Sequence, residues 1–241
     1  MKINILTLFP EMFEPLRQSM LGRAIDNGIL ELDVTDIRDY TTDKHNRVDD
    51  TPYGGGAGMV MQVQPILDAC EGAGYGGEVL YMSPRGELLD GAIAEELSKN
   101  DEITILCGHY EGVDQRALDM LGAREISIGD YVLTGGELPA MVLVDTVARF
   151  VKGVLPKEES VMNESIYSGL LEYPHYSRPA EYKGMAVPEV LLSGDHGAVD
   201  LWRWEQSLLL TKERRPDLFE KYLAEEHDFS KKEKGILEKY R

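Results

Sequence analysis

Short apolar segments typical of buried β-strands alternate with segments of helical spacing through the first two-thirds of the chain. The strand candidates are rich in Ile, Leu and Val, which suits strands that are covered on both faces. They span Lys2–Phe9, Leu30–Ile37, Glu78–Met82, Glu102–Cys107 and Glu125–Ile128. The helix candidates span Glu14–Asn27, Pro65–Ala73, Leu88–Lys99, Asp114–Leu121 and Glu137–Phe150. This alternation predicts an α/β fold with a mainly parallel sheet and helices on its faces.

The pattern changes after Phe150, where Gly and Pro are interspersed with charged residues. Leu201–Leu210 and Pro216–Leu223 have helical spacing, so we expect a small, all-helical second domain. The highly charged stretch Glu225–Arg241 is expected to be a solvated helix end or a frayed tail. We therefore divide the chain into a first domain, an interdomain linker and a C-terminal domain, covering residues 1–155, 156–166 and 167–241.

Composition limits the classes of protein to consider. Hydrophobic residues make up 43% of the 241 residues, which is enough for a packed core, and the net charge of −18 argues against a protein coated in basic surface. Cys70 and Cys107 are too few for a disulfide framework or a four-thiolate zinc site, so we expect reduced thiols in a cytoplasmic protein. The histidines lack tight ligand spacing, and we predict no bound transition metal.

The apolar runs are too short to cross a membrane, so we expect no membrane partner. The first run is interrupted by Asn4 and Thr7 and stopped by Pro10, which indicates a buried strand and not a signal peptide.

Glycine-bearing loops follow three of the strand candidates. They span Tyr81–Gly86, Gly108–Gly112 and Gly129–Glu137. In open α/β sheets, ligands bind beyond the carboxyl ends of the strands, and glycines let the backbone approach a ligand closely. Glycine is also ordinary in such turns, so a single loop is weak support. The equivalent positions of all three predict a shared ligand site.

Two other motifs leave alternatives open. Gly54–Gly58 lies in a long loop over residues 38–62 but lacks the spacing of a dinucleotide-binding motif and the lysine of a P-loop, so it is a flexible spacer or a mobile loop that faces a substrate. Cys107 and His109 are spaced so that both side chains of an extended strand would point the same way. That pair is either a thiol nucleophile with its base or a buried small residue beside an unrelated histidine.

Basic and aromatic residues are interleaved in the last third of the chain. Such mixtures suit RNA, because cations bind phosphates and rings stack on bases. An exposed face with extended arginines is the competing interpretation. The residues that we single out for RNA binding are Asp50, Tyr53 and Gly54 in the long loop, and His175, Arg178, Arg203, Arg214 and Arg215 after the linker.

Several motifs together resemble the bacterial tRNA (guanine-N1)-methyltransferases of the SPOUT superfamily. They are Leu8–Phe13, Val48–Met59, the three glycine loops, Arg149–Leu155 and Gly169–Pro179, and their order covers residues 4 to about 220. The resemblance implies a SPOUT domain with a deep C-terminal trefoil knot. It also implies a homodimer with active sites at the interface, S-adenosylmethionine as methyl donor, and N1 of guanosine 37 in tRNA as the acceptor.

The resemblance implies a set of cofactor-binding residues in the three loops. They are Tyr81, Met82, Ser83, Pro84, Gly108, Tyr110, Glu111, Gly112, Ser127, Ile128, Gly129, Tyr131, Leu133, Gly135 and Gly136. It also implies two catalytic residues. Glu164 would remove the N1 proton, and Arg149 would stabilise charge on O6. The family usually has aspartate where Glu164 stands, which adds a methylene here. Family members are reported to need Mg²⁺, which Glu111 or Glu164 could help hold, although the sequence has no dedicated cage.

Rival functions remain at this stage. They are a SPOUT methyltransferase for another RNA or base, a non-catalytic RNA-binding protein with the same fold, and a hydrolase that uses Cys107 and His109. The net charge of −18 conflicts with an RNA substrate unless basic residues gather locally.

Overall fold

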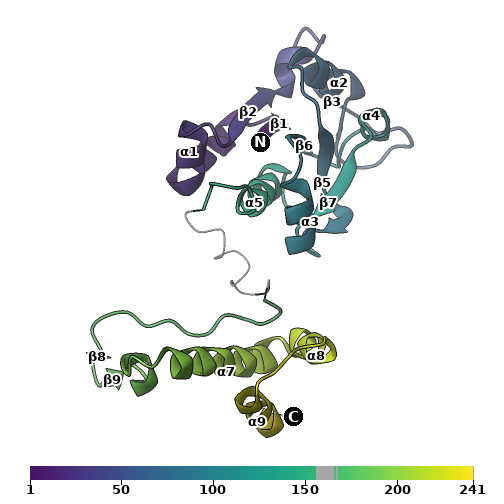
Figure 1. The fold of residues 1–241 in the computed structure, drawn as a ribbon. Helices are drawn as coiled ribbons and strands as arrows, with labels where there is room; N and C mark the ends of the chain where they lie inside the picture. Colours follow the sequence, from purple (N-terminus) through teal and green to yellow (C-terminus); the bar gives the residue numbers. More distant parts are fainter. Residues whose placement is uncertain (156–165, 167, 241) are drawn as a thin grey trace. The chain divides into compact units, whose positions relative to one another are not determined.

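The computed structural model describes residues 1–155, 166 and 168–240. Contacts between residues divide the chain into two compact units, Met1–Glu158 and Glu159–Arg241 (Figure 1). Each unit has its own hydrophobic core.

The first unit is built on a parallel sheet with the strand order β2-β1-β6-β5-β7. The strands are β1 (Lys2–Thr7), β2 (Glu31–Asp36), β5 (Glu78–Leu88), β6 (Glu102–Leu106) and β7 (Arg124–Ser127). Each overlaps a strand candidate in the sequence, so the prediction of a mainly parallel α/β sheet is confirmed. All five strands run in the same direction, so their carboxyl ends meet at one edge.

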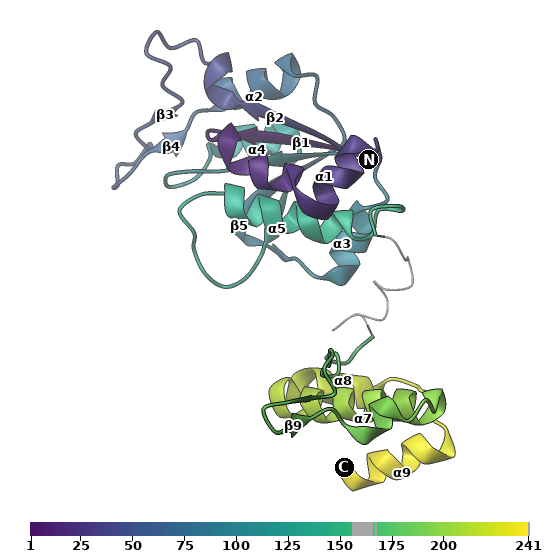
Figure 2. The same cartoon turned by 90° about the vertical axis from the view of Figure 1, so that its left-hand side faces the viewer.

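Helices cover both faces of this sheet (Figures 1 and 2). On β1, Ile5 faces one core and Leu6 the other, since successive side chains of a strand alternate between faces. The first core is covered by η1 (Pro10–Arg17), α1 (Ser19–Asp26), α3 (Gly91–Leu97) and α5 (Glu137–Ala148). The second core is covered by η2 (Ile37–Tyr40), α2 (Val63–Gly72) and α4 (Gln115–Leu121).

The predicted helix Glu14–Asn27 is divided into two helices. The backbone of Gln18 is extended (ψ 168°) and Ser19 has a positive φ of 56°, so the helical hydrogen-bond ladder cannot run through this point. Pro15, inside η1, also lacks the backbone N–H that a continuous α-helix requires.

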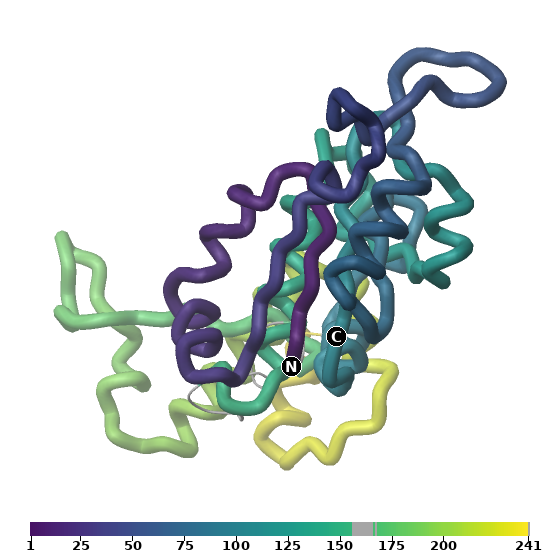
Figure 3. The backbone as a smooth tube through the Cα atoms, turned by 90° about the horizontal axis from the view of Figure 1, so that it is seen from above, coloured from purple at the N-terminus to yellow at the C-terminus, as the bar shows by residue number. Residues whose placement is uncertain are grey.

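The long loop over residues 38–62 contains a short hairpin of β3 (Asp49–Asp50) and β4 (Val60–Met61). The segment between these strands projects from the rest of the unit (Figures 2 and 3). Tyr53, in this segment, is fully exposed.

The second unit is mainly helical, with α7 (His196–Arg214), α8 (Pro216–Ala224) and α9 (Lys231–Tyr240). It also contains η3 (Glu189–Leu192) and a hairpin of β8 (Glu181–Tyr182) and β9 (Met185–Ala186), so the prediction of an all-helical domain was wrong in this detail. Lys183 and Gly184 both have positive φ, as a type I′ hairpin turn requires, and glycine meets this requirement without strain.

The charged tail is also more ordered than predicted. Ile236 and Leu237 of α9 are buried in a core with Leu208 and Phe219. Burying two such side chains stabilises the folded state by about 1.5–3 kcal/mol each, which opposes fraying. Across the described parts of both units, no helix is long and apolar enough to cross a membrane.

Candidate functional site

A cavity of about 390 Å³ lies beside the middle of β5 and the ends of β6 and β7. Its wall is formed by residues 81–85, 108–113, 115, 126–129 and 131–136, together with Pro139 of α5. All the residues predicted to bind the cofactor are in this wall, so the three loops converge as expected. Arg85, His109, Val132 and Thr134 of the three predicted loops are also in the wall, and the sequence reasoning missed Val113, Gln115, Ile126 and Pro139.

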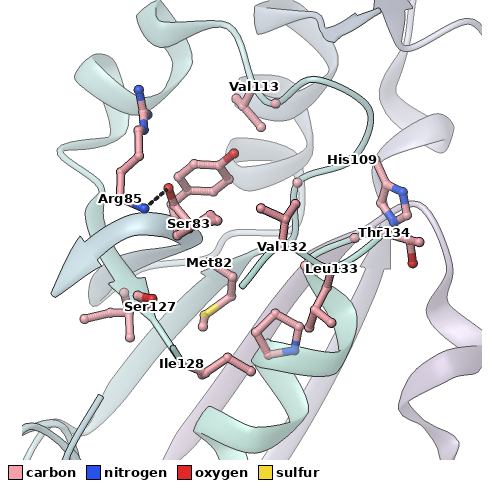
Figure 4. A pocket seen from close by; sticks show the side chains of 18 of the residues that line it. Met82, Ser83, Arg85, His109, Val113, Ser127, Ile128, Val132, Leu133 and Thr134 are labelled. Atoms are coloured by element: carbon pink, nitrogen blue, oxygen red, sulfur yellow. Dashed lines mark hydrogen bonds between the residues drawn. The ribbon is translucent and has the colours of Figure 1, made fainter. Parts of the chain in front are cut away.

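The first wall segment differs from the predicted loop because β5 continues through it to Leu88. Met82 and Glu87 both pair with Ile126 of β7, so the intervening residues bulge out of the sheet. The Ser83 hydroxyl accepts a hydrogen bond from the Arg85 backbone N–H (3.2 Å), which closes the bulge (Figure 4). A bulge of this kind redirects side chains beside a site without ending the strand.

The second and third wall segments are in direct contact. The Gly136 N–H donates to the Gly108 carbonyl oxygen at 2.8 Å. A Cβ atom at Gly136 would lie 2.7 Å from Cys107 Cα, so no larger residue fits there without displacing backbone. Tyr81 lies beside Gly108, and burial raises the pKa of its phenol, which keeps this hydroxyl protonated.

The side chains around the cavity are of two kinds. Figure 4 shows the apolar side chains of Met82, Ile128 and Leu133 close together, and His109 with Thr134 beyond them. Val132 and Tyr131 are 82% and 55% exposed, so apolar surface remains uncovered at this edge of the first unit. The cavity can therefore take a ligand with both apolar and polar parts.

A buried carboxylate connects the cavity to the core of the sheet. Glu137, at the start of α5, is 1% exposed. One of its carboxylate oxygens accepts from the Thr7 hydroxyl at 2.7 Å, and the other lies 2.7 Å from His109 Nε2. Glu137 thus joins β1 to the loop that holds His109 and to its own loop, which ends at Gly135-Gly136. One weak signal for it is visible in the sequence, an acidic residue directly after Gly135-Gly136, but its partners are remote in the chain.

The interpretation of Cys107 as a nucleophile was wrong. Cys107 lies just beyond the end of β6 and is fully buried in the first core, whereas His109 is in the cavity wall and faces Glu137. The alternation rule for strands does not hold past Leu106, where β6 ends. Burial, and then the charge of Glu137, raise the pKa of Cys107 well above its ordinary value, which disfavours the reactive thiolate.

The residues predicted to bind RNA fall into separate groups. Asp50, Tyr53 and Gly54 belong to the projecting hairpin of the first unit. The base of that hairpin is tied to the cavity wall, because the Glu111 N–H donates to the Met59 carbonyl and the Met61 N–H to the Gly112 carbonyl, both at 2.9 Å. This part of the long loop is therefore anchored beside the cavity, which favours the substrate-facing interpretation over a free spacer.

The other RNA-binding candidates belong to the second unit. His175, Arg178 and Arg203 line one cavity, whereas Arg214 and Arg215 lie at the end of α7. Arg215 forms an ion pair with Asp217 at 2.6 Å. The structure therefore brings together three of the five candidates.

The catalytic candidates are only partly described. Arg149 caps the C-terminus of α5, where its backbone N–H donates to the Asp145 carbonyl at 3.3 Å. Glu164 lies outside the described residues. Within the described parts of the chain, no three His, Cys, Asp or Glu side chains cluster closely enough to hold a metal ion.

An open parallel sheet with helices on both faces defines the class of doubly wound α/β proteins. Proteins of this class bind ligands beside the carboxyl ends of the strands, where the glycine-lined cavity lies. A family model described as tRNA (Guanine-1)-methyltransferase TrmD matches residues 1–221. The chain belongs to this family.

Three curated relatives named tRNA (guanine-N(1)-)-methyltransferase support that membership. The chain is 53% identical over 230 residues to the protein of Clostridium perfringens, covering 95% of this chain and 97% of the relative. It is 54% identical over 226 residues to that of Ruminiclostridium cellulolyticum, covering 92% and 97%. It is 52% identical over 233 residues to that of Lachnospira eligens, covering 95% and 99%.

Proposed function

We propose that this protein transfers a methyl group from S-adenosylmethionine to N1 of guanosine 37 in tRNA, next to the anticodon. The observation that carries the proposal is the convergence of three glycine-bearing loops on one cavity in a chain of this family. Sites for small molecules are usually clefts of roughly 300–1,000 Å³, and the cavity of about 390 Å³ falls in that range.

The chemistry of the cavity wall suits S-adenosylmethionine, which would supply an electrophilic methyl group. Glycines in the wall let a ligand approach the backbone closely, and Met82, Ile128 and Leu133 provide apolar surface. Glu111, also in the wall, carries a negative charge that would attract a sulfonium. These groups would bind and orient the donor and exclude water from it.

The acceptor requires a base, because N1 of neutral guanine carries a proton. We assign proton removal to Glu164 and stabilisation of the charge that develops on O6 to Arg149. Arg149 follows α5 at the end opposite the cavity wall, about 18 Å along the helix, so the proposed role requires the Arg149 of a second copy of the chain. We place Glu164 in a linker over 156–166, between a methyltransferase domain (1–155) and a helical tRNA-binding domain (167–241).

The same proposal includes a deep trefoil knot and a homodimer. The contact of Gly136 with Cys107 and Gly108 supports a chain that passes tightly through the loop after β6. α5 has buried residues such as Leu143 on one side, while Leu138 and Val142 remain 49% and 45% exposed. Apolar side chains exposed on an outer helix face are unfavourable in water, and a second copy of the chain would cover them.

We place the protein in the cytoplasm with its tRNA substrate.

We further propose that Mg²⁺ contributes to the reaction, bound either by the tRNA or by the carboxylates of Glu111 and Glu164. Calorimetric titration of the tRNA-free protein with MgCl₂ distinguishes the two locations of the ion, since only a protein site gives a binding isotherm without RNA.

Transfer of labelled methyl groups to a tRNA transcript with guanosines at positions 36 and 37 tests the function. We expect transfer that requires guanosine at 37 and falls at least 100-fold in Glu164→Gln. A matched transcript with another base at 37 is the control. Full activity of Glu164→Gln would show that another residue removes the N1 proton, and Glu111 would be the next candidate. No transfer by the wild type would refute the proposed tRNA substrate.

A further inference from the structure

His109 lies where four segments of the first unit meet, and the proposed reaction assigns it no role. It belongs to the loop after β6 and lines the methyl-donor cavity, and its side chain is 17% exposed. Its Nε2 lies 2.7 Å from Glu137 of α5, and its ring packs against Phe9, which follows β1, with centroids 4.9 Å apart. Its backbone N–H donates to the Met61 sulfur of β4 at 3.2 Å. A side chain with these neighbours fixes the loop that carries it.

The pair of His109 and Glu137 also contacts the third glycine loop. Gly135 is packed so closely on this pair that a Cβ atom there would overlap both the His109 ring and the Glu137 carboxylate. One residue further, the Gly136 N–H donates to the carbonyl oxygen of Gly108 at 2.8 Å. The second and third loops are therefore joined twice, once through backbone atoms and once through two side chains.

Thr7 orients Glu137 from the side of the sheet. The Thr7 hydroxyl accepts from the Phe9 N–H at 3.0 Å, so its own hydrogen is free to donate to Glu137, whose oxygen lies at 2.7 Å. A carboxylate accepts at both oxygens, which makes His109 Nε2–H the donor to the second one. Because a buried carboxylate oxygen without a partner is strongly unfavourable, this chain of hydrogen bonds holds the His109 ring in one place.

We propose that His109 is a positioning residue of the methyl-donor site and acts through its hydrogen bond to Glu137. The inference rests on the proposed function and deepens it, because it concerns the binding of S-adenosylmethionine in the same cavity. The next residue, Tyr110, has a positive φ of 59°, a conformation that persists in a residue with a side chain only when its surroundings hold it. A loop that is ordered before the donor arrives does not have to be ordered at the expense of binding free energy.

His109→Leu in the full-length protein tests the hydrogen bond, and His109→Gln is the matched control because it keeps an N–H that can reach Glu137. By calorimetry we expect the Kd for S-adenosylmethionine to rise about 10-fold in His109→Leu and to stay within about threefold in His109→Gln. The KM for S-adenosylmethionine should rise with the Kd. The kcat at saturating donor and tRNA should change by less than about twofold, since a positioning residue does not touch the reacting atoms.

An apolar replacement of the whole chain of polar groups separates positioning from folding stability. It combines Thr7→Val, Glu137→Met and His109→Leu, so that no buried polar group is left unpaired. Its melting temperature should exceed that of His109→Leu alone. Its Kd for S-adenosylmethionine should nevertheless stay about 10-fold above the wild-type value, because the hydrogen bond is still missing. Recovery of affinity together with stability would overturn the inference, since packing alone would then position the loop.

The remaining outcomes distinguish the inference from the proposed function. Equal affinity of the wild type and His109→Leu for S-adenosylmethionine would overturn the inference and leave the proposed function intact. An equal loss of affinity in His109→Gln and His109→Leu would also overturn the inference, because a retained N–H would then make no difference. A wild type that does not bind S-adenosylmethionine would overturn both.

Discussion

At the scale of single residues, Glu137 and Cys107 show how burial decides chemical role. Both lie close to the cavity, and both are almost fully buried. Glu137 retains polar partners at each carboxylate oxygen, so its burial is compensated by hydrogen bonds. Cys107 is surrounded by apolar side chains of the first core and behaves as a small hydrophobic residue.

Replacing Glu137 by Ala should destabilise the first unit, because the buried Thr7 hydroxyl and the His109 ring would each lose a partner. We expect the free energy of unfolding, measured by urea denaturation, to fall by about 3 kcal/mol, with weaker binding of S-adenosylmethionine. Glu137→Gln keeps the shape and one acceptor and should lose less than half as much. Glu87→Ala, which removes an exposed ion pair with Arg124, is the control and should change little. A near-neutral Glu137→Ala would contradict this role.

Cys107→Ala should retain methyl transfer and lose only about 1 kcal/mol of stability. In the native protein the thiol should resist iodoacetamide at pH 8, since its pKa is raised well above the ordinary value and the thiolate is scarce at that pH. Alkylation should become fast in urea, where burial no longer raises the pKa. Rapid modification of native protein accompanied by loss of activity would restore the thiol hypothesis.

At the scale of elements, the first unit depends on close backbone contacts between loops as much as on its helices and strands. The N-terminus of α5 is pressed against the end of β6 through Gly136 and Gly108. The bulge in β5 adds a third segment to the same wall. The shape of the cavity therefore depends on the backbone contacts between these three segments.

Gly136→Ala tests that dependence. Gly136 has a negative φ of −80°, so alanine causes no backbone strain, and its effect comes from the Cβ atom 2.7 Å from Cys107 Cα. We expect S-adenosylmethionine binding to weaken at least tenfold by calorimetry, with a lower melting temperature. Gly235→Ala in α9 is the matched control, because nothing lies within 4 Å of its Cβ position. It should stabilise the helix by about 0.5–1 kcal/mol.

At the scale of the whole molecule, the proposed function requires a dimer interface and a tRNA-binding surface. The exposed residues of α5 and the cavity edge form apolar surface on the first unit. The net charge of −18 requires that phosphate-binding cations be gathered locally if tRNA is to bind.

Leu138→Glu combined with Val142→Glu should convert a dimer into monomers, because charges placed in an apolar interface cannot be paired. Sedimentation velocity checks the mass, and specific activity should fall with it. Met120→Glu, a change at a 71% exposed apolar residue of α4, should leave the mass unchanged. If the wild type sediments as a monomer while active, the dimer proposal is wrong.

Arg214→Gln with Arg215→Gln should weaken tRNA binding and reduce the slope of log K against log salt by up to about 1.5, since two phosphate contacts would be lost. Lys231→Gln with Lys232→Gln removes the same charge from α9 and should have a smaller effect on that slope. Equal slopes for the arginine variant and the wild type would place the phosphate contacts elsewhere.

The sequence by itself determined the alternation of strands and helices and the three loops that meet at the cavity. Those features are local, because the burial of each strand fixes its apolar composition and parallel strands bring their ends to one edge. Only the tertiary structure decided the contact of Glu137 with Thr7, the bulge in β5, the packing of α9, and the joining of His175, Arg178 and Arg203 around one cavity. Such contacts join residues far apart in the chain, so they depend on the path of the backbone and not on any local period.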